Sequence, residues 1–172
     1  PRKIVEASVG TGIFFEIGHD WGRGIVCGFA RLDGYPVGIL AGDPFFLDGA
    51  WTADVCDKVT RHMDLCSQFH LPVVHFVDCP GFAVGVKAET AGVTRAGVRA
   101  MTAIYQADVP VCSVVIRKAY GLAGSAMMNQ SRTKWRYCWP SGDWGSLPMA
   151  GGIEAAFRKE LAEAEDPEAL KA

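Results

Sequence analysis

The chain has 172 residues, of which 49% are hydrophobic, and a formal net charge of −2. This length accommodates one domain with a sizeable core, and the composition argues against disorder over most of the chain. Neither the net charge nor any cluster of Lys and Arg indicates a nucleic-acid-binding surface. No apolar run approaches the ~20 residues that a membrane-spanning helix needs.

The six cysteines are widely spaced, with no CxxC pair and no zinc-ribbon spacing. Most of them lie in apolar runs, where a thiol behaves as a small hydrophobic side chain. We therefore expect reduced, buried cysteines and no metal site, which fits the cytoplasm or a mitochondrial matrix. The chain begins at Pro1-Arg2-Lys3 without Met, signal peptide or transit peptide, and is therefore expected to be a fragment.

The first half of the chain predicts a hairpin followed by an amphipathic helix. Residues 1–23 are expected to form a short helix or a linker. Residues 24–31 and 36–41 are β-prone, and the turn sequence Asp33-Gly34 joins them. From residue 52 to 69 the apolar side chains recur at helical spacing, which predicts a helix with one buried face.

The second half alternates strands and helices. The expected elements are strands at 72–77, 111–116 and 135–139, and helices at 88–106, 122–129 and from 153 to about 164. This alternation predicts an α/β fold with parallel strand pairing. Because such sheets bind ligands at the carboxyl ends of their strands, residues 78–85 and 118–124 are the candidate site segments.

Each candidate segment has two interpretations. In Gly121-Leu122-Ala123-Gly124, the free N–H groups of a helix start could hold an oxyanion. A tight turn that uses glycine for steric reasons is the alternative, and chemistry alone favours it. In the same way Asp78 could cap a helix, bind a ligand or act as a base, whereas Pro80-Gly81 is ordinary turn chemistry.

Chemistry-bearing side chains are scarce elsewhere. We expect His62 and His70 on the surface and His75 as a hydrogen-bonded histidine of the core. The sequence has no nucleophile elbow, no phosphate loop and no complete dinucleotide fingerprint. If the protein is an enzyme, backbone N–H donors are therefore expected to dominate its catalysis.

Five ordered segments resemble the β-type carboxyltransferase subunit of biotin-dependent acyl-CoA carboxylases. They are residues 14–17, 28–39, 77–82, 115–121 and 137–140, and residues 151–154 complete the match. The resemblance spans nearly the whole chain. It implies a crotonase-like (ClpP/crotonase) fold, with a parallel-rich sheet flanked by helices.

The resemblance also implies a domain organisation and a reaction. The family has an N-terminal half that binds acyl-CoA and a C-terminal half that binds biotin. Residues 1–23 resemble the lead-in, and residues 24–172 resemble the C-terminal carboxyltransferase domain, truncated at its end. The implied reaction transfers a carboxyl group from N1′-carboxybiotin to the α-carbon of an acyl-CoA. The implied partners are a biotin carboxyl carrier or biotin carboxylase subunit and further copies of the chain, with a hexamer expected.

Site residues follow from the family's motifs. The resemblance assigns backbone N–H donors for the negatively charged ureido group of biotin to Leu122 and Ala123. Ser125 stands where the family has an aspartate associated with acyl-chain selectivity, so the identity of the acyl-CoA substrate stays open. The residues implied to bind biotin are Gly81, Phe82, Tyr120 and Gly121.

The chain departs from the family's motifs at two further places, and three alternative functions remain. Leu122 stands where many family members have glycine, and Arg95-Ala96-Gly97 replaces the more usual Arg-His-Gly. The alternatives are a decarboxylase subunit of a sodium-pumping complex, which runs the transfer in reverse, a non-catalytic assembly piece, and a crotonase-type hydratase. A hydratase would need a glutamate pair near its oxyanion hole, and these segments offer none.

Overall fold

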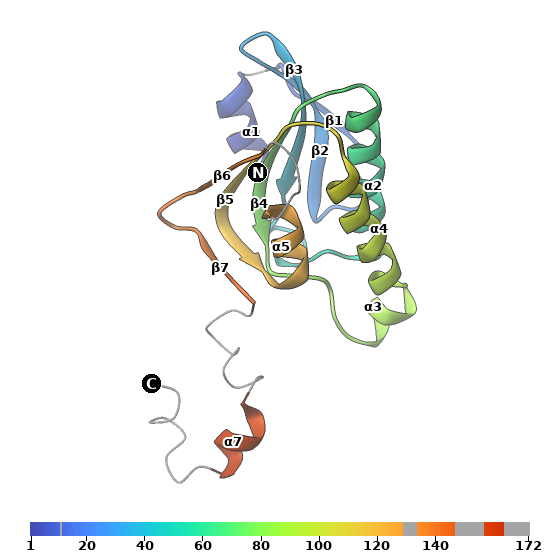
Figure 1. Ribbon diagram of the computed structural model, residues 1–172, viewed down its shortest axis with the longest axis vertical. Helices are drawn as coiled ribbons and strands as arrows, with labels where there is room; N and C mark the ends of the chain where they lie inside the picture. Colours follow the sequence, from blue (N-terminus) through green and yellow to red (C-terminus); the bar gives the residue numbers. More distant parts are fainter. Residues whose placement is uncertain (11, 129–133, 147–156, 164–172) are drawn as a thin grey trace.

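A seven-stranded sheet organises the computed structural model, which describes residues 1–10, 12–128, 134–146 and 157–163 (Figure 1). The strands run in the order β1-β2-β3-β4-β5-β6, and β7 also pairs with β5. The strands are β1 (Phe15–Ile17), β2 (Ile25–Leu32), β3 (Tyr35–Gly42), β4 (Val73–Cys79), β5 (Val111–Tyr120), β6 (Lys134–Cys138) and β7 (Asp143–Gly145). The helices are α1 (Arg2–Val9), α2 (Ala53–Gln68), α3 (Val86–Thr90), α4 (Val93–Gln106), α5 (Gly121–Met128) and α7 (Arg158–Glu163), with a 3₁₀ turn, η1, at Leu47–Gly49.

The sheet has an antiparallel edge and a parallel centre. β2 and β3 form the predicted hairpin, and both turn residues, Asp33 and Gly34, adopt positive φ angles of 49° and 84°. These angles suit a two-residue turn whose twist matches that of the strands. From β3 onward, β4, β5, β6 and β7 pair in parallel. The α/β fold with parallel pairing is therefore confirmed.

Helices cover the two faces of the sheet unequally (Figure 1). One face packs against α2, α4 and α5, and its core includes Val55, Val59 and Met63 of α2, none of them more than 1% exposed. The opposite face packs against α1, through Val5 and Val9. Thr52 caps α2 by accepting a hydrogen bond from the N–H of Val55 (3.3 Å), so the predicted start of this helix is correct.

Several predicted boundaries were wrong. The lead-in is more than a helix or linker, because β1 pairs with β2. The helix expected at 88–106 is divided into α3 and α4, since Gly92 between them adopts a left-handed φ of 76°. The strand expected to end at 116 continues to Tyr120, because β7 supplies a partner for residues 118–120. Of the helix expected from 153 to 164, residues 153–156 and 164 lie outside the described residues.

Buried polar groups give a second correction. His62 is 5% exposed rather than on the surface, and His75 is 1% exposed, as predicted. Within the described part of the chain, however, Nε2 of His75 has no hydrogen-bond partner. All six cysteines are free thiols; Cys112 is half-buried, Cys138 is exposed and the other four are buried. Over the residues that the structure describes, no helix has the length and apolarity to cross a membrane.

Candidate functional site at the carboxyl edge of the sheet

The two candidate segments start from neighbouring positions of the parallel sheet. Cys79 at the end of β4 pairs with Ala119 near the end of β5. A Cβ placed on Gly81 would lie 3.8 Å from the carbonyl oxygen of Tyr120. The segment after β4 therefore approaches the segment after β5 at the carboxyl edge of the sheet.

The junction between β5 and α5 has no loop. β5 ends at Tyr120, and α5 begins at Gly121, whose φ of +62° favours glycine. Three residues later, a side chain on Gly124 would collide with the main chain of Ala119, only 2.5 Å from its carbonyl carbon. The first N–H groups of a helix have no intrahelical acceptor, so this junction directs unpaired donors toward the carboxyl edge of the sheet.

Side chains on α5 divide into an outward and an inward set. Leu122 is 69% exposed, and Ser125, one helical turn further on, is also exposed. Ala123 is fully buried against the core. Leu122 and Ser125 therefore share the outer face of the helix, whereas Ala123 lies on the inner face that packs against the core.

Tyr120 is buried and Phe82 is half-buried against the core. Tyr120 is 4% exposed and its hydroxyl donates to a carboxylate oxygen of Asp143, which raises the pKa of the phenol. The Phe82 ring makes an edge contact with Trp51 (6.1 Å between centroids) and would meet any side chain placed on Gly97 of α4. These two rings thus hold the segments in place. At the carboxyl edge of the sheet, the two residues therefore present mainly backbone atoms.

A charge network ties β4 and β5 to η1, the 3₁₀ turn that follows β3. Nε of Arg117, on β5, donates to both carboxylate oxygens of Asp78 on β4, at 3.1 Å each. Its Nη2 donates to Asp48 in η1 at 2.6 Å, and Nζ of Lys118 donates to the other oxygen of Asp48 at 2.6 Å. Charge-assisted bonds of this kind are stronger than neutral ones, so the network fixes η1 and β4 to the strand that leads into α5.

The two carboxylates of this network differ in protonation behaviour. Burial raises the pKa of Asp78, and the hydrogen bond from Arg117 only partly opposes that rise. Hydrogen bonds from Lys118 and Arg117 lower the pKa of the more exposed Asp48. Arg117 is therefore the counter-charge that allows Asp78 to be ionised inside the fold.

Comparison with known proteins decides the family. A family model described as the carboxyl transferase domain matches residues 1–172. The chain belongs to this family. Its fold is that of a solved member, a crystal structure of transcarboxylase 12S described as a hexamer assembly with methylmalonyl-coenzyme A and methylmalonic acid bound. That match has a TM-score of 0.87 and 33% identity, and covers 99% of this chain and 33% of that one.

Two relatives of this carboxyl transferase domain carry different names. A propionyl-CoA carboxylase carboxyltransferase subunit of Haloferax mediterranei is 34% identical, over 99% of this chain and 34% of the relative. A methylmalonyl-CoA decarboxylase subunit alpha of Veillonella parvula is also 34% identical, over 92% of this chain and 31% of the relative. The chain thus spans about a third of the length of these curated relatives.

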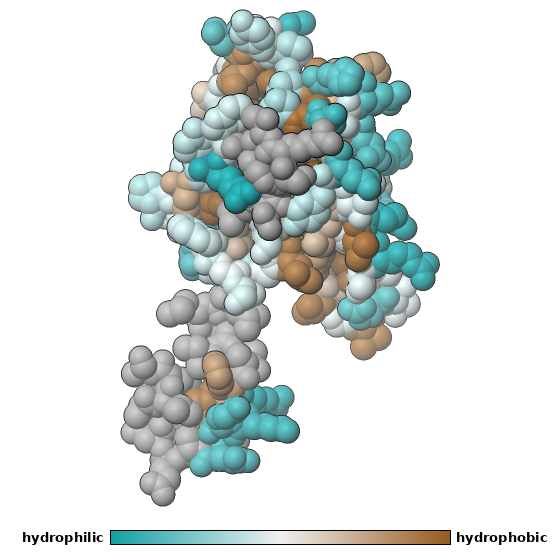
Figure 2. Space-filling model, in the orientation of Figure 1, coloured by the Kyte–Doolittle hydropathy of each residue, from teal (hydrophilic) through white to brown (hydrophobic). Residues whose placement is uncertain are grey.

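The carboxyl transferase domain presents apolar surface beside its candidate site. Figure 2 shows brown surface over the region of α5 and α3. The exposed apolar side chains there include Leu122 at the start of α5, and Val84 and Val86 around the start of α3. Aromatic side chains of β6 and of the residue after it are exposed too, with Trp135, Tyr137 and Trp139 each at least 44% exposed. These side chains therefore place exposed apolar atoms on the surface next to the candidate site.

Sequence reasoning missed the parts of this site that join distant segments. Asp48 gave no signal, because its position depends on a 3₁₀ turn in which its own φ is +54°. Asp143 was missed with β7, a strand of three residues. The adjacent cations Arg117 and Lys118 at a strand end were the one available signal, since two neighbouring charges in a buried strand require partners.

Proposed function

We propose that this chain supplies the biotin-side half of a carboxyltransferase, which moves a carboxyl group from N1′-carboxybiotin to the α-carbon of an acyl-CoA. The observation that carries the proposal is the junction of β5 and α5 in a chain that matches the carboxyl transferase domain over its full length. The acyl-CoA half belongs to a part of the protein outside this chain.

The residues at the junction fit the ureido group of biotin. The N1′–carboxyl bond of carboxybiotin breaks, biotin leaves with negative charge on its ureido oxygen, and its N1′ takes the proton that the α-carbon of the acyl-CoA gives up. The N–H groups of Leu122 and Ala123 are the donors we assign to that oxygen, since they belong to the unpaired first turn of α5. Donors fixed in place before the reaction stabilise developing charge without reorganisation.

The neighbouring residues have supporting roles in the proposal. We assign the wall of the biotin site to the backbone of Gly81, Phe82 and Gly121, which lie at the same edge. Tyr120 orients this edge through its hydroxyl bond to Asp143. Ser125 shares the outer face of α5 with Leu122, and we assign it to acyl-chain selectivity.

The proposal also covers the direction of carboxyl transfer and the partners of the intact protein. The equal identity to a carboxylase subunit and to a decarboxylase subunit supports one shared transfer step and makes the reverse direction the second candidate. We propose that the intact protein is a cytoplasmic homo-oligomer, a hexamer, that takes its carboxybiotin from a carrier or biotin carboxylase partner. The exposed apolar side chains beside α5 support such an assembly.

Replacement of Leu122 in the intact protein tests the proposed donors. Leu122→Pro should reduce carboxyl transfer by ~10²-fold or more, because proline has no N–H to donate. Leu122→Gly is the matched control and should keep appreciable transfer, because glycine retains the N–H group. Transfer from carboxybiotin, acyl-CoA binding and thermal stability should be measured on each variant. A folded Leu122→Pro enzyme with near-normal transfer would contradict the role of this amide.

A further inference from the structure

A partly open cavity lies apart from the β5–α5 junction, between α2 and the segment that follows β1. Its volume is about 350 Å³. Ile17, Trp21 and Leu65 provide apolar walls, and Lys58, Arg61 and His62 provide nitrogen atoms. No carboxylate is among the described residues that line it. A mostly apolar cavity of this size with a few grouped polar atoms is typical of a small-molecule site.

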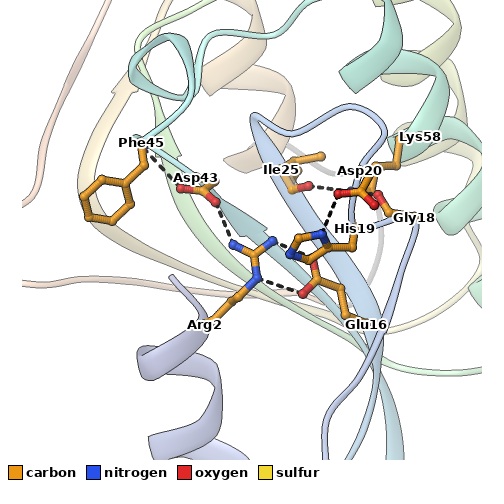
Figure 3. Close-up of polar contacts among 9 residues, drawn as sticks. All are labelled: Arg2, Glu16, Gly18, His19, Asp20, Ile25, Asp43, Phe45 and Lys58. Atoms are coloured by element: carbon orange, nitrogen blue, oxygen red, sulfur yellow. Dashed lines mark hydrogen bonds and ion pairs between the residues drawn. The ribbon is translucent and has the colours of Figure 1, made fainter.

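Lys58 is a buried cation without an acidic partner in the described chain. It is 3% exposed, and its Nζ donates to the carbonyl oxygens of Gly18 (2.9 Å) and Ile25 (2.8 Å) (Figure 3). An ammonium group has three N–H donors, so one remains. Burial lowers the pKa of Lys58, as expected for a cation that is poorly compensated.

The nearest acids are engaged elsewhere. Glu16 and Asp43 both act on Lys58 through their charge, yet both pair with Arg2, at 2.7 Å and 3.0 Å (Figure 3). Arg2 thus holds these carboxylates outside ion-pair distance of Lys58. A buried charge is normally paired, which leaves the cavity side of Lys58 suited to an external anion.

The surrounding backbone packs closely against the methylene groups of the Lys58 side chain. The segment from Gly18 to Gly22 passes directly over the lysine side chain: a Cβ on Gly22 would lie 3.1 Å from Cδ of Lys58 and 2.9 Å from the carbonyl oxygen of Asp54. Gly22 also has a φ of +56°, which favours glycine. Lys58 is therefore held in one position, with little freedom to swing into solvent.

The cavity has a second cation and one neutral imidazole. Arg61 is exposed, and its guanidinium lies 5.8 Å from the centre of the Trp21 ring. His62 stacks obliquely on Phe29 (5.3 Å between ring centroids), and burial lowers its pKa to about 4. His62 is consequently neutral near pH 7, and the cavity carries the two positive charges of Lys58 and Arg61.

We propose that this cavity binds a small monocarboxylate with a compact apolar body. Lys58 and Arg61 hold the carboxylate, and the hydrocarbon body packs against Ile17, Trp21 and Leu65. The apolar walls favour such a ligand over inorganic phosphate, which would leave them in contact with water. This site is distinct from the proposed biotin site, and its occupation can be measured without any carboxyl transfer.

Calorimetric titration of the intact protein with hexanoate tests the proposal. Hexanoate should bind, and hexanol and inorganic phosphate should each bind at least ~10-fold more weakly, because each lacks one of the two recognised features. Arg61→Met should weaken hexanoate binding ~10-fold or more, and Lys58→Met should abolish it. Arg23→Met is the matched control, because Arg23 is an exposed arginine over the Phe46 ring (5.0 Å) outside this cavity, and it should leave binding unchanged.

Three results would overturn the proposal. They are no binding of hexanoate by the folded protein, hexanol binding as tight as hexanoate binding, and Arg61→Met binding as tight as that of the unaltered protein. Because Arg61 is exposed, its replacement should leave the fold intact even if Lys58→Met fails to fold. The comparison of ligands on the unaltered protein also needs no variant.

Discussion

Two arginine networks hold the segment that follows β3, and they differ in what else they touch. Arg2 of α1 pairs with Glu16 on β1 and with Asp43 at the start of this segment (Figure 3). Arg117 of β5 pairs with Asp78 on β4 and with Asp48 in the middle of it. The two arginine side chains are almost equally exposed, at 38% and 40%.

The difference lies in position along the chain. Arg2 joins the N-terminal helix to the edge of the sheet, far from α5 in sequence. Arg117 lies four residues before Gly121, in the strand that carries the junction with α5. The same ion-pair chemistry therefore stabilises the fold at one place and positions a candidate site at the other. Variants of the two arginines separate these roles.

Arg117→Met should have the largest effect. It leaves Asp78 buried without its cation, which we expect to reduce the free energy of unfolding by about 2 kcal/mol after allowance for the partial exposure of Arg117. Carboxyl transfer should fall ~10-fold or more, because the start of α5 loses its fixed position relative to β4. Urea unfolding and transfer kinetics on the intact protein measure the two effects separately.

Lys118→Met is the matched control for Arg117→Met. Lys118 donates to Asp48 alone within the network and leaves Asp78 paired. Its loss of stability should stay within about 1 kcal/mol, as for exposed ion pairs. If both variants lower transfer equally, the network acts through Asp48 and the proposed importance of the Asp78 contact is wrong.

The contrast between these networks also explains how far the sequence could predict the fold. The hairpin, the parallel strands and α2 follow from local patterns: the Asp33-Gly34 turn, the apolar runs and the helical spacing of residues 55–66. The β5–α5 junction was predicted because glycines between an apolar run and small residues mark a helix start. Each of these signals lies within a few neighbouring residues.

What the sequence could not predict depends on contacts between distant segments. β1 is a strand only because β2 lies beside it, and β5 is longer than its apolar run because β7 pairs with its end. His62 looks polar in sequence, yet its ring packs against Phe29 of β2 from the buried side of α2. The partners of Arg117 are 39 and 69 residues away, and no local pattern encodes such pairs.

Arg2→Met should cost about as much stability as Arg117→Met, but little activity. Glu16 and Asp43 have side chains only 15% and 9% exposed, so loss of their shared cation should reduce the free energy of unfolding by about 2 kcal/mol. Transfer by the folded protein should stay within about twofold, because α5 keeps its contacts. A ~10-fold loss of transfer at full folding would show that the two networks are coupled and not separate.

The smallest effect should come from Asp48→Asn, and it should depend on pH. Asn tolerates the positive φ of residue 48, so the change removes mainly the charge. Near pH 7 we expect a loss of about 0.5–1 kcal/mol, since the Asp48 side chain is 47% exposed. Hydrogen bonds, from Lys118 first, lower the pKa of Asp48 below its ordinary value of 3.8. The stabilising contribution of the carboxylate is therefore complete above that value and is lost as the pH falls below it.

Urea unfolding of the unaltered protein and Asp48→Asn at pH 7 and near pH 3 measures this dependence. The difference between the two proteins should shrink at the lower pH, because pH 3 lies below the ordinary pKa of an aspartate and the unfolded chain then binds a proton that the ion-paired carboxylate of the folded protein resists. A double-mutant cycle with Lys118→Met should give a coupling energy that falls in the same way. A difference that stays constant across this range would mean that Asp48 acts through the shape of the 3₁₀ turn rather than through its ion pairs, and that Arg117 holds η1 without help from charge.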